Sequence, residues 1–285
     1  MKIIILGASG MLGNAVFRHL AADSRYEVWG TVRSSSALRH FSSAEQERLV
    51  VGLDVLNQDD LLEFTAQHRP DVVVNCIGLV KQLASANDPL SILPVNAMLP
   101  HRLQKITELC GARLIHISTD CVYSGSKGMY VESDISDAED LYGKSKYIGE
   151  VIGCTNAVTL RTSIIGHELS SNRSLVDWFL TQVGTVKGFK RAIFSGLPTV
   201  EIARIIGDYV LPNPDLRGLY HVSAKPIDKF SLLNVIAEKY GKVIDIVPDD
   251  ALVIDRSLDS SLFQAATGYV PPGWNDLIAN MRDFK

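Results

Sequence analysis

A glycine-rich turn near the N-terminus constrains the fold of this chain more than any other feature. The apolar run Lys2–Leu6 leads directly into Gly7-x-x-Gly10-x-x-Gly13, and such a run is typical of a strand buried on both faces of a parallel sheet. The three glycines allow a tight turn, a close approach of backbone to a pyrophosphate, and close packing of a helix on the strand. This strand–turn–helix context predicts a dinucleotide site. Its candidate contacts are Gly7, Ser9, Gly10, Met11 and Leu12.

Strand and helix patterns alternate along the first part of the chain. The expected strands are Lys2–Leu6, Tyr26–Val32, Arg48–Leu53, Asp71–Ile77, Arg113–Ser118 and Ala157–Thr162. The expected helices are Met11–Ala22, Gln58–His68, Pro89–Cys110 and Leu141–Ile152. This spacing is that of βαβ units, and it predicts an α/β fold with a Rossmann-like, doubly wound parallel sheet.

The alternation of strand and helix patterns becomes less regular beyond Gly166. Helical patterns recur at Ser174–Gln182, Val200–Val210 and Phe230–Lys239, and prolines between them mark turns. We expect residues 1–162 to form the NADP-binding Rossmann domain. We expect residues 163–285 to form a smaller C-terminal α/β lobe that binds substrate, with parts that could return to the first domain.

The bulk properties argue against several classes of protein. The 285 residues are 46% hydrophobic and 21% charged, an ordinary globular composition. A net charge of −4 without a basic run argues against nucleic acid or an anionic membrane as a partner. No segment reaches the ~18 apolar residues of a membrane span, and the N-terminal apolar stretch is too short for a signal peptide. The four cysteines lack metal-ligand spacing, so we expect no metal site and reduced thiols in a cytoplasmic protein.

Tyr142 and Lys146 are spaced i,i+4 within one expected helix. They lie one turn apart on the same helix face, where an ammonium can approach a phenol. A nearby cation favours the phenolate and moves the phenol pKa from about 10 toward neutral pH, so the pair is a candidate proton relay. Alone, such a pair is more often a surface contact, but the neighbouring motifs favour the catalytic interpretation.

The end of the second expected strand indicates which dinucleotide binds. NAD sites usually place an Asp or Glu there, whereas NADP sites use an Arg for the 2′-phosphate. The stretch Thr31-Val-Arg-Ser-Ser-Ser36 holds no carboxylate, so we expect NADP(H) to be preferred over NAD(H), with Arg33 and Ser34 as contacts. An exposed arginine in a polar loop is the alternative. Asp54, beside Val55, could reach the adenine amino group or serve as a loop or capping residue.

The fifth expected strand ends in Ser118-Thr119-Asp120-Cys121. In open α/β sheets, ligands bind outside the carboxyl ends of the strands, and a hydroxyl there can donate to a carbonyl oxygen that becomes an alkoxide. Together with the glycine motif, Asn75-Cys-Ile-Gly78 and the Tyr142/Lys146 pair, this segment resembles the extended short-chain dehydrogenase/reductases.

Within that superfamily the chain most resembles the dTDP-4-dehydrorhamnose reductase family. The resemblance rests on Ser118 to Tyr123, Tyr142 to Glu150, Arg161-Thr-Ser163 and Gly196-Leu-Pro-Thr199. It implies NADPH-dependent reduction of the C4 ketone of a nucleotide-diphosphate-linked 4-keto-6-deoxyhexose, in deoxysugar biosynthesis for surface polysaccharide. A nucleotide sugar is the implied partner, and a homodimer is one assembly that the chain could form.

The resemblance also assigns roles to individual residues. Thr119 would polarise the carbonyl, Tyr142 would donate the proton, and Lys146 would activate Tyr142 and bind the cofactor ribose. Cys76 and Gly78 would join the cofactor contacts. The implied substrate contacts are Lys81, Thr119, Asp120, Cys121, Ser195 and Pro198, and for Lys81 a solvated loop lysine is the alternative.

The sequence departs from the family pattern at Cys121 and in one two-residue segment, and other activities stay open. Cys121 stands where an aromatic residue is common, and Phe194-Ser195 stand where Asp-Gln is common. A sugar-nucleotide 4,6-dehydratase would need an Asp-Glu pair in place of Asp120-Cys121, whereas a nucleotide-sugar 4-epimerase shares the Thr/Tyr/Lys set. A non-catalytic NADP-binding regulatory subunit, such as the one known for methionine adenosyltransferase, is the alternative from another class.

Overall fold

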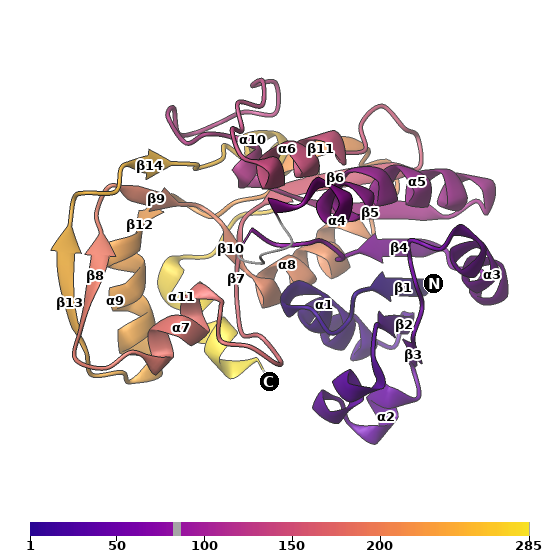
Figure 1. Ribbon diagram of the computed structural model, residues 1–285, viewed down its shortest axis with the longest axis horizontal. Helices are drawn as coiled ribbons and strands as arrows, with labels where there is room; N and C mark the ends of the chain where they lie inside the picture. Colours follow the sequence, from indigo (N-terminus) through magenta and orange to yellow (C-terminus); the bar gives the residue numbers. More distant parts are fainter. Residues whose placement is uncertain (82–86, 285) are drawn as a thin grey trace.

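The computed structural model describes residues 1–81 and 87–284 and is built around one parallel sheet (Figure 1). Seven strands form this sheet in the order β11-β6-β5-β4-β1-β2-β3, with parallel pairing throughout. Their bounds are β1 (Lys2–Leu6), β2 (Glu27–Val32), β3 (Leu49–Val51), β4 (Val72–Asn75), β5 (Arg113–Thr119), β6 (Ala157–Thr162) and β11 (Gly218–His221). The predicted Rossmann-like doubly wound sheet is therefore confirmed.

Helices cover both faces of this sheet, which explains why its central strands are apolar throughout. Ile3 and Ile5 of β1 pack into one core with α1 and α8, whereas Ile4 and Leu6 pack into a second core with α3 and α5. The helices are α1 (Met11–Ala21), α2 (Ser43–Gln46), α3 (Gln58–His68), α4 (Pro89–Ile92), α5 (Leu99–Leu109), α6 (Leu141–Ile148), α7 (Leu175–Thr181), α8 (Thr199–Ile205), α9 (Lys229–Tyr240), α10 (Ser261–Thr267) and α11 (Trp274–Asp283).

A second lobe lies beyond the carboxyl ends of the main strands, on the left in Figure 1. Its small sheets pair β8 (Thr185–Phe189) with β13 (Asp245–Asp249), β9 (Ala192–Phe194) with β12 (Ile227–Asp228) and β14 (Ile254–Asp255), and β7 (Ile164–Ile165) with β10 (Leu197–Pro198). Side chains of α7, α9 and α11 fill its core. However, β11 joins the main sheet beside β6, and α8 packs on α1. The division of the chain at residue 162 stays a prediction.

Two helices expected within residues 1–162 differ from those observed. The helix expected over Pro89–Cys110 contains a wide π-helical turn, Leu93–Met98, between α4 and α5. The helix expected over Leu141–Ile152 ends at Ile148, where Gly149 packs so closely on the Asn96 carbonyl that an added Cβ would lie 1.9 Å from its oxygen. Close packing between segments sets both features, and hydrophobic periodicity does not reveal such packing.

Over residues 1–81 and 87–284, no helix combines the length and the apolar character that a membrane crossing requires.

Candidate active site

The glycine turn after β1 has the geometry that a pyrophosphate site requires. Gly7 has a φ of +83°, a conformation that favours glycine, and its N–H donates to Thr31 Oγ1 at 3.1 Å. At Gly13, an added Cβ would lie 2.1 Å from the Gly7 carbonyl oxygen, so the helix can approach the strand only without a side chain. Gly10 begins α1 in extended conformation without a side-chain cap. The N-terminal N–H groups of α1 can therefore hold a phosphate.

The loop after β2 presents the residues predicted to choose between NADP and NAD. Arg33 and Ser34 are exposed, and Ser34 Oγ accepts the Ser36 N–H at 3.2 Å. Asp54 is also exposed, and its Oδ1 accepts the Leu56 N–H at 3.0 Å, which is the turn-capping role considered as its alternative. Val55 beside it is half-buried. This arrangement leaves the Arg33 guanidinium accessible to a phosphate.

The segment after β4 is held by a residue that the sequence analysis did not select. Asn96, in the π-helical turn, accepts the Leu79 N–H with Oδ1 at 2.8 Å and donates from Nδ2 to the Leu79 carbonyl at 3.0 Å. The same Nδ2 donates to Ser145 Oγ of α6 at 3.3 Å. Asn96 thereby fixes the backbone next to Gly78 against the helix that carries Tyr142. Its only signal in the sequence is a polar residue within an apolar helical stretch.

Thr119 and Tyr142 come together at the carboxyl end of β5. Thr119 is 8% exposed; its Oγ1 donates to Asp120 Oδ1 at 3.1 Å and accepts the Cys121 N–H at 3.2 Å. Burial raises the pKa of Tyr142, the negative charge of a Cys121 thiolate would raise it further, and a hydrogen bond with Thr119 partly opposes the rise. At neutral pH, Tyr142 is therefore a protonated phenol next to the Thr119 hydroxyl.

Lys146 lies on the same helix, but it is not among the main causes of the Tyr142 pKa shift. Its Nζ donates to the Ile117 carbonyl at 2.7 Å. Burial lowers the pKa of Lys146 to about 8, whereas Glu150 and Cys76 act in the opposite direction. The expected electrostatic depression of the phenol pKa is thus wrong for this structure, because burial dominates Tyr142 and Lys146 turns toward β5. Burial also raises the pKa of Cys76, to about 12.

A buried ion pair supports the strand ends beneath these groups. Glu150 accepts from Ser118 Oγ at 2.6 Å and from Arg161 Nε at 2.8 Å, and Arg161 is 1% exposed. Arg161 Nη1 also donates to the Tyr123 hydroxyl at 2.5 Å and lies 2.8 Å from His221 Nε2. The network connects β5, β6 and β11 with the segment after α6, and it fixes the backbone that presents Thr119.

Two cationic side chains from the second lobe face the same site. Arg256, which follows β14, donates from Nε to the Tyr123 carbonyl at 2.7 Å, and its Nη1 lies 3.6 Å from Cys121 Sγ. Lys229, the first residue of α9, interacts electrostatically with Asp120, Arg256 and Cys121. Sequence reasoning missed both residues, because no motif or periodicity marks a lone cation in a loop or at a helix start.

The residues predicted to contact substrate occupy two environments. Lys81 forms an exposed ion pair with Asp140 at 2.6 Å, just ahead of Tyr142. Asp120 is buried, which raises its pKa, while Arg256 acts to lower it; burial and the Asp120 charge raise the pKa of Cys121 to about 12.

In contrast, Ser195 and Pro198 lie inside the protein. Ser195 Oγ accepts the Leu258 N–H at 2.9 Å, and Pro198 belongs to β10. The structure therefore brings Asp120 and Cys121 to Thr119 and Tyr142, whereas Ser195 and Pro198 are buried.

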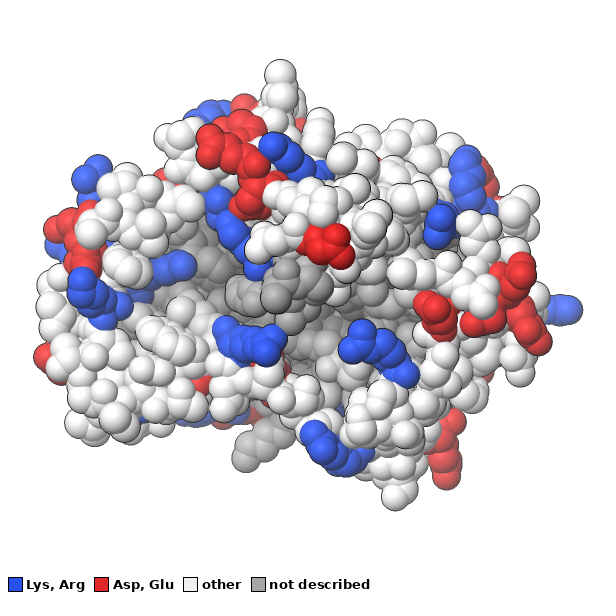
Figure 2. Space-filling view, viewed as in Figure 1, with Lys and Arg blue, Asp and Glu red and all other residues white. Residues whose placement is uncertain are grey.

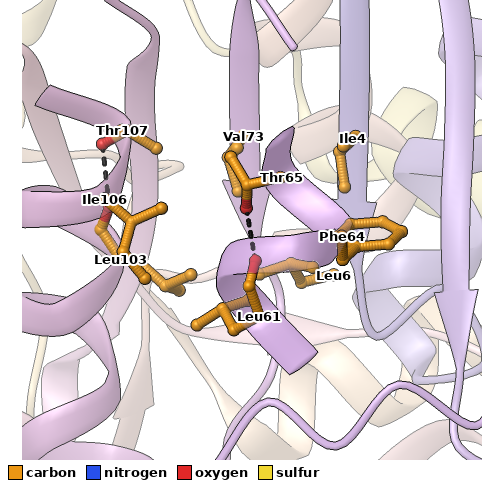
Figure 3. Close-up of a pocket in the computed structure, with 9 residues that line it drawn as sticks. All are labelled: Ile4, Leu6, Leu61, Phe64, Thr65, Val73, Leu103, Ile106 and Thr107. Carbon is orange, nitrogen blue, oxygen red and sulfur yellow. Dashed lines mark hydrogen bonds between the residues drawn. The ribbon is translucent and has the colours of Figure 1, made fainter. Parts of the chain in front are cut away.

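Lys and Arg side chains border the hollow between the two lobes (Figure 2). A separate apolar cavity of about 10 Å³ lies between α3 and α5 under the sheet (Figure 3), too small for more than a single water. Its lining is Ile4, Leu6, Leu61, Phe64, Thr65, Val73, Leu103, Ile106 and Thr107. Among the described residues, no group of three or more His, Cys, Asp or Glu side chains gathers as metal ligands would.

Known proteins are similar to this chain in sequence and in fold. A dTDP-4-dehydrorhamnose reductase of Aggregatibacter actinomycetemcomitans is 26% identical, with 99% of each chain covered. The methionine adenosyltransferase 2 subunit beta of Mus musculus is 24% identical over 84% of this chain and 72% of its own length.

A crystal structure of dTDP-4-dehydrorhamnose reductase from Bacillus anthracis in complex with NADP has a TM-score of 0.78, with 20% identity and coverage of 99% of this chain and 98% of the other. The model of the RmlD substrate binding domain matches residues 1–281. The predicted family resemblance is thereby confirmed: the chain belongs to the RmlD substrate-binding-domain family.

Proposed function

We propose that this protein is an NADPH-dependent oxidoreductase that reduces the C4 ketone of a nucleotide-diphosphate-linked 4-keto-6-deoxyhexose. The observation that carries the proposal is the pairing of the Thr119 and Tyr142 hydroxyls at the carboxyl end of β5, one helical turn from Lys146. Two adjacent hydroxyl donors at this edge of the sheet can bind a carbonyl oxygen and stabilise the charge that develops on it.

Each side chain of the site has a separate proposed role in the reduction. NADPH, when bound, supplies the hydride, and the protein supplies orientation and charge stabilisation. Thr119 Oγ1 donates to the ketone oxygen, and Tyr142 gives its proton to the same atom as the alkoxide forms. The raised pKa of Tyr142 keeps the phenol protonated at neutral pH, which is the form that a proton donor requires. Lys146, positively charged below about pH 8, holds the ribose of the cofactor.

The chain's residues fit the proposed cofactor. The turn at Gly7 and the uncapped N-terminus of α1 suit a pyrophosphate. Arg33 and Ser34 supply donors for a 2′-phosphate where an NAD site would place a carboxylate. The proposed preference for NADP(H) over NAD(H) follows from these two residues.

The second lobe supplies the proposed contacts with the nucleotide sugar. Arg256 places a guanidinium beside Cys121 and Asp120, at the border between the lobes. A diphosphate-linked substrate is anionic, so this cation favours its binding. The identity of the sugar would depend on Asp120 and Cys121, which lie next to Thr119.

The first test offers the protein NADPH and a panel of dTDP-, UDP- and GDP-linked 4-keto-6-deoxyhexoses, and follows the loss of NADPH absorbance. Tyr142→Phe should lower turnover by roughly 10²–10⁴ with NADPH binding retained, because only the proton donor is lost. Tyr147→Phe, on the exposed face of the same helix, is the matched control. A folded, NADPH-bound Tyr142→Phe variant that reduces substrate at the wild-type rate would exclude this mechanism.

A non-catalytic regulatory subunit is the second candidate, because the subunit beta of methionine adenosyltransferase matches most of this chain. It would bind NADP but turn over none of the panel. A nucleotide-sugar 4-epimerase would instead invert C4 without net consumption of NADPH. Product analysis of the same incubations separates these three outcomes.

A further inference from the structure

A cavity of about 270 Å³ lies between the two lobes, apart from the proposed active site. Its walls come from α1, the start of α8, the end of α11 and the loop that follows β7. The helix α8 packs on both α1 and α11, and Figure 1 shows these three helices near the C-terminus. Tyr142 belongs instead to α6, which packs on β5 and the π-helical turn. Of the described residues that line the cavity, none is assigned above to the cofactor or to the substrate.

The Asn14 side chain lines this cavity without a hydrogen-bond partner. It is 7% exposed, and neither the oxygen nor the nitrogen of its amide bonds to another group in the described part of the chain. Its backbone N–H is already used, because it donates to the Gly10 carbonyl at 2.8 Å. Buried amides are normally hydrogen-bonded, since an unpaired polar group away from water costs free energy. The Asn14 amide is therefore available to a ligand.

Arg18 lies one turn further along α1 and presents a second donor. Its Nε donates to Glu45 Oε1 at 3.0 Å, and its Nη2 donates to the His40 carbonyl at 2.6 Å. These contacts fix the guanidinium, but they leave Nη1 without a partner among residues 1–81 and 87–284. The Thr199 hydroxyl, at the start of α8, also lines the cavity and is likewise unpaired within those residues. Several donors at one cavity suit a group with many acceptor atoms.

The remainder of the lining is mostly apolar and has no described carboxylate. Arg282 contributes a second guanidinium, and the described lining residues include no Asp or Glu. The apolar walls are Leu169, Val200, Met281 and Phe284. Apolar walls with a few convergent polar groups are typical of small-molecule sites, whose volumes begin at about 300 Å³. The cavity is therefore large enough for a small organic ligand.

We propose that this cavity binds a small organic anion, a carboxylate or a phosphate ester attached to an apolar body. Asn14 and Arg18 donate to the oxygens of the anion, and hydrogen bonds to an ionised group are the stronger ones. The apolar body packs on the walls. Neither reduction nor cofactor binding requires this site, so the inference goes beyond the proposed function and does not rest on it. The ligand would contact both lobes at once.

The experiment is calorimetric titration of the full chain with four probes. Phenyl phosphate and phenylacetate carry both an anion and an apolar ring, whereas 2-phenylethanol lacks the charge and inorganic phosphate lacks the ring. Excess NADPH and dTDP are present throughout, so that the proposed cofactor and substrate sites are occupied. We expect at least one of the two aromatic anions to bind roughly tenfold or more tightly than either of the other two probes.

Three variants locate the binding. Asn14→Leu and Arg18→Met should each weaken the aromatic anion roughly tenfold or more, because each removes a donor. Val200→Phe fills the cavity and removes no donor, so it tests the site even if Asn14→Leu fails to fold. Exposed Asn213→Leu and Arg191→Met are the matched controls. Thermal unfolding and NADPH binding check that every variant folds.

The outcomes decide both the site and its ligand class. Absence of saturable binding by both aromatic anions overturns the proposal, as does binding that disappears when NADPH and dTDP are added. Binding that survives in all of the folded variants places the anion elsewhere and also overturns it. If 2-phenylethanol binds as tightly as the anions, the assignment of an anionic ligand is wrong. Loss of binding in the variants, with the controls unchanged, supports the site.

Discussion

Burial sets the protonation of the central side chains more strongly than their mutual charge. Tyr142 has a raised pKa and Lys146 a lowered one, and desolvation is the largest cause in both cases. The spacing of the two residues in sequence predicts that the cation activates the phenol. The structure instead directs the Lys146 ammonium to the Ile117 carbonyl. At the residue scale, the sequence therefore identifies the candidate groups, but their protonation depends on packing that sequence does not show.

The lowered pKa of Lys146 predicts a pH dependence. Its charged form dominates below pH 8 and is lost as the pH rises through about 8, so NADPH affinity and kcat/KM should fall on the alkaline side of that value. Lys146→Met should remove this alkaline limb and weaken NADPH at every pH, whereas exposed Lys144→Met should leave the profile in place. A wild-type profile that stays flat from pH 7 to about 9.5 would contradict the assignment.

The second residue-scale prediction concerns the cofactor. Removing the charge-assisted contact of Arg33 with a 2′-phosphate should cost about 1.5–3 kcal/mol. Arg33→Ala should therefore weaken NADPH roughly ten- to a hundredfold and barely affect NADH, as titration calorimetry would show. Arg48→Ala, exposed at the opposite end of the neighbouring strand β3, is the control. Equal losses for NADPH and NADH would refute a 2′-phosphate contact.

At the scale of elements, a buried ion pair connects the segment after α6 to β6. Glu150 and Arg161 are both buried and share two hydrogen bonds, at 2.8 and 2.5 Å. Because removal of one partner leaves the other charge uncompensated, Glu150→Gln should lower the free energy of unfolding by about 3–5 kcal/mol. Denaturant titration measures this loss, and Glu108→Gln, in an exposed pair on α5, should show none. If Glu150→Gln also left the free energy of unfolding unchanged, the buried network would not stabilise the strand ends.

The elements that the sequence predicts well are those governed by local pattern. The β1 strand, the glycine turn, α3 and β6 follow from apolar runs, glycine spacing and amphipathic periodicity. The π-helical turn that presents Asn96, and the early end of α6 at Gly149, depend on contact between two segments that are distant in sequence. The same reason explains why Arg256 was missed: its contact with the Tyr123 carbonyl spans 133 residues.

At the scale of the whole molecule, one strand segment connects the lobes. The Asp255 N–H donates to the Gly125 carbonyl at 2.8 Å, Arg256 Nε donates to the Tyr123 carbonyl at 2.7 Å, and the Tyr130 N–H donates to the Ser257 carbonyl at 2.9 Å. These bonds hold a second-lobe cation against the carboxyl end of β5. The lobe that we propose to select the substrate is therefore joined directly to the lobe that carries Thr119 and Tyr142.

This connection predicts a division of labour that kinetics can measure. Arg256→Met removes the cation facing Asp120 and Cys121, so the KM for the nucleotide sugar should rise about tenfold, the equivalent of roughly 1.4 kcal/mol. The Kd of NADPH should change much less, because the cofactor residues lie on the first lobe. Arg256→Lys keeps the charge and should recover part of the affinity, while Arg191→Met on the exposed β8–β9 turn is the control. A weakened NADPH Kd with an unchanged KM would place Arg256 at the cofactor, and the second lobe would then lose its proposed role in substrate selection.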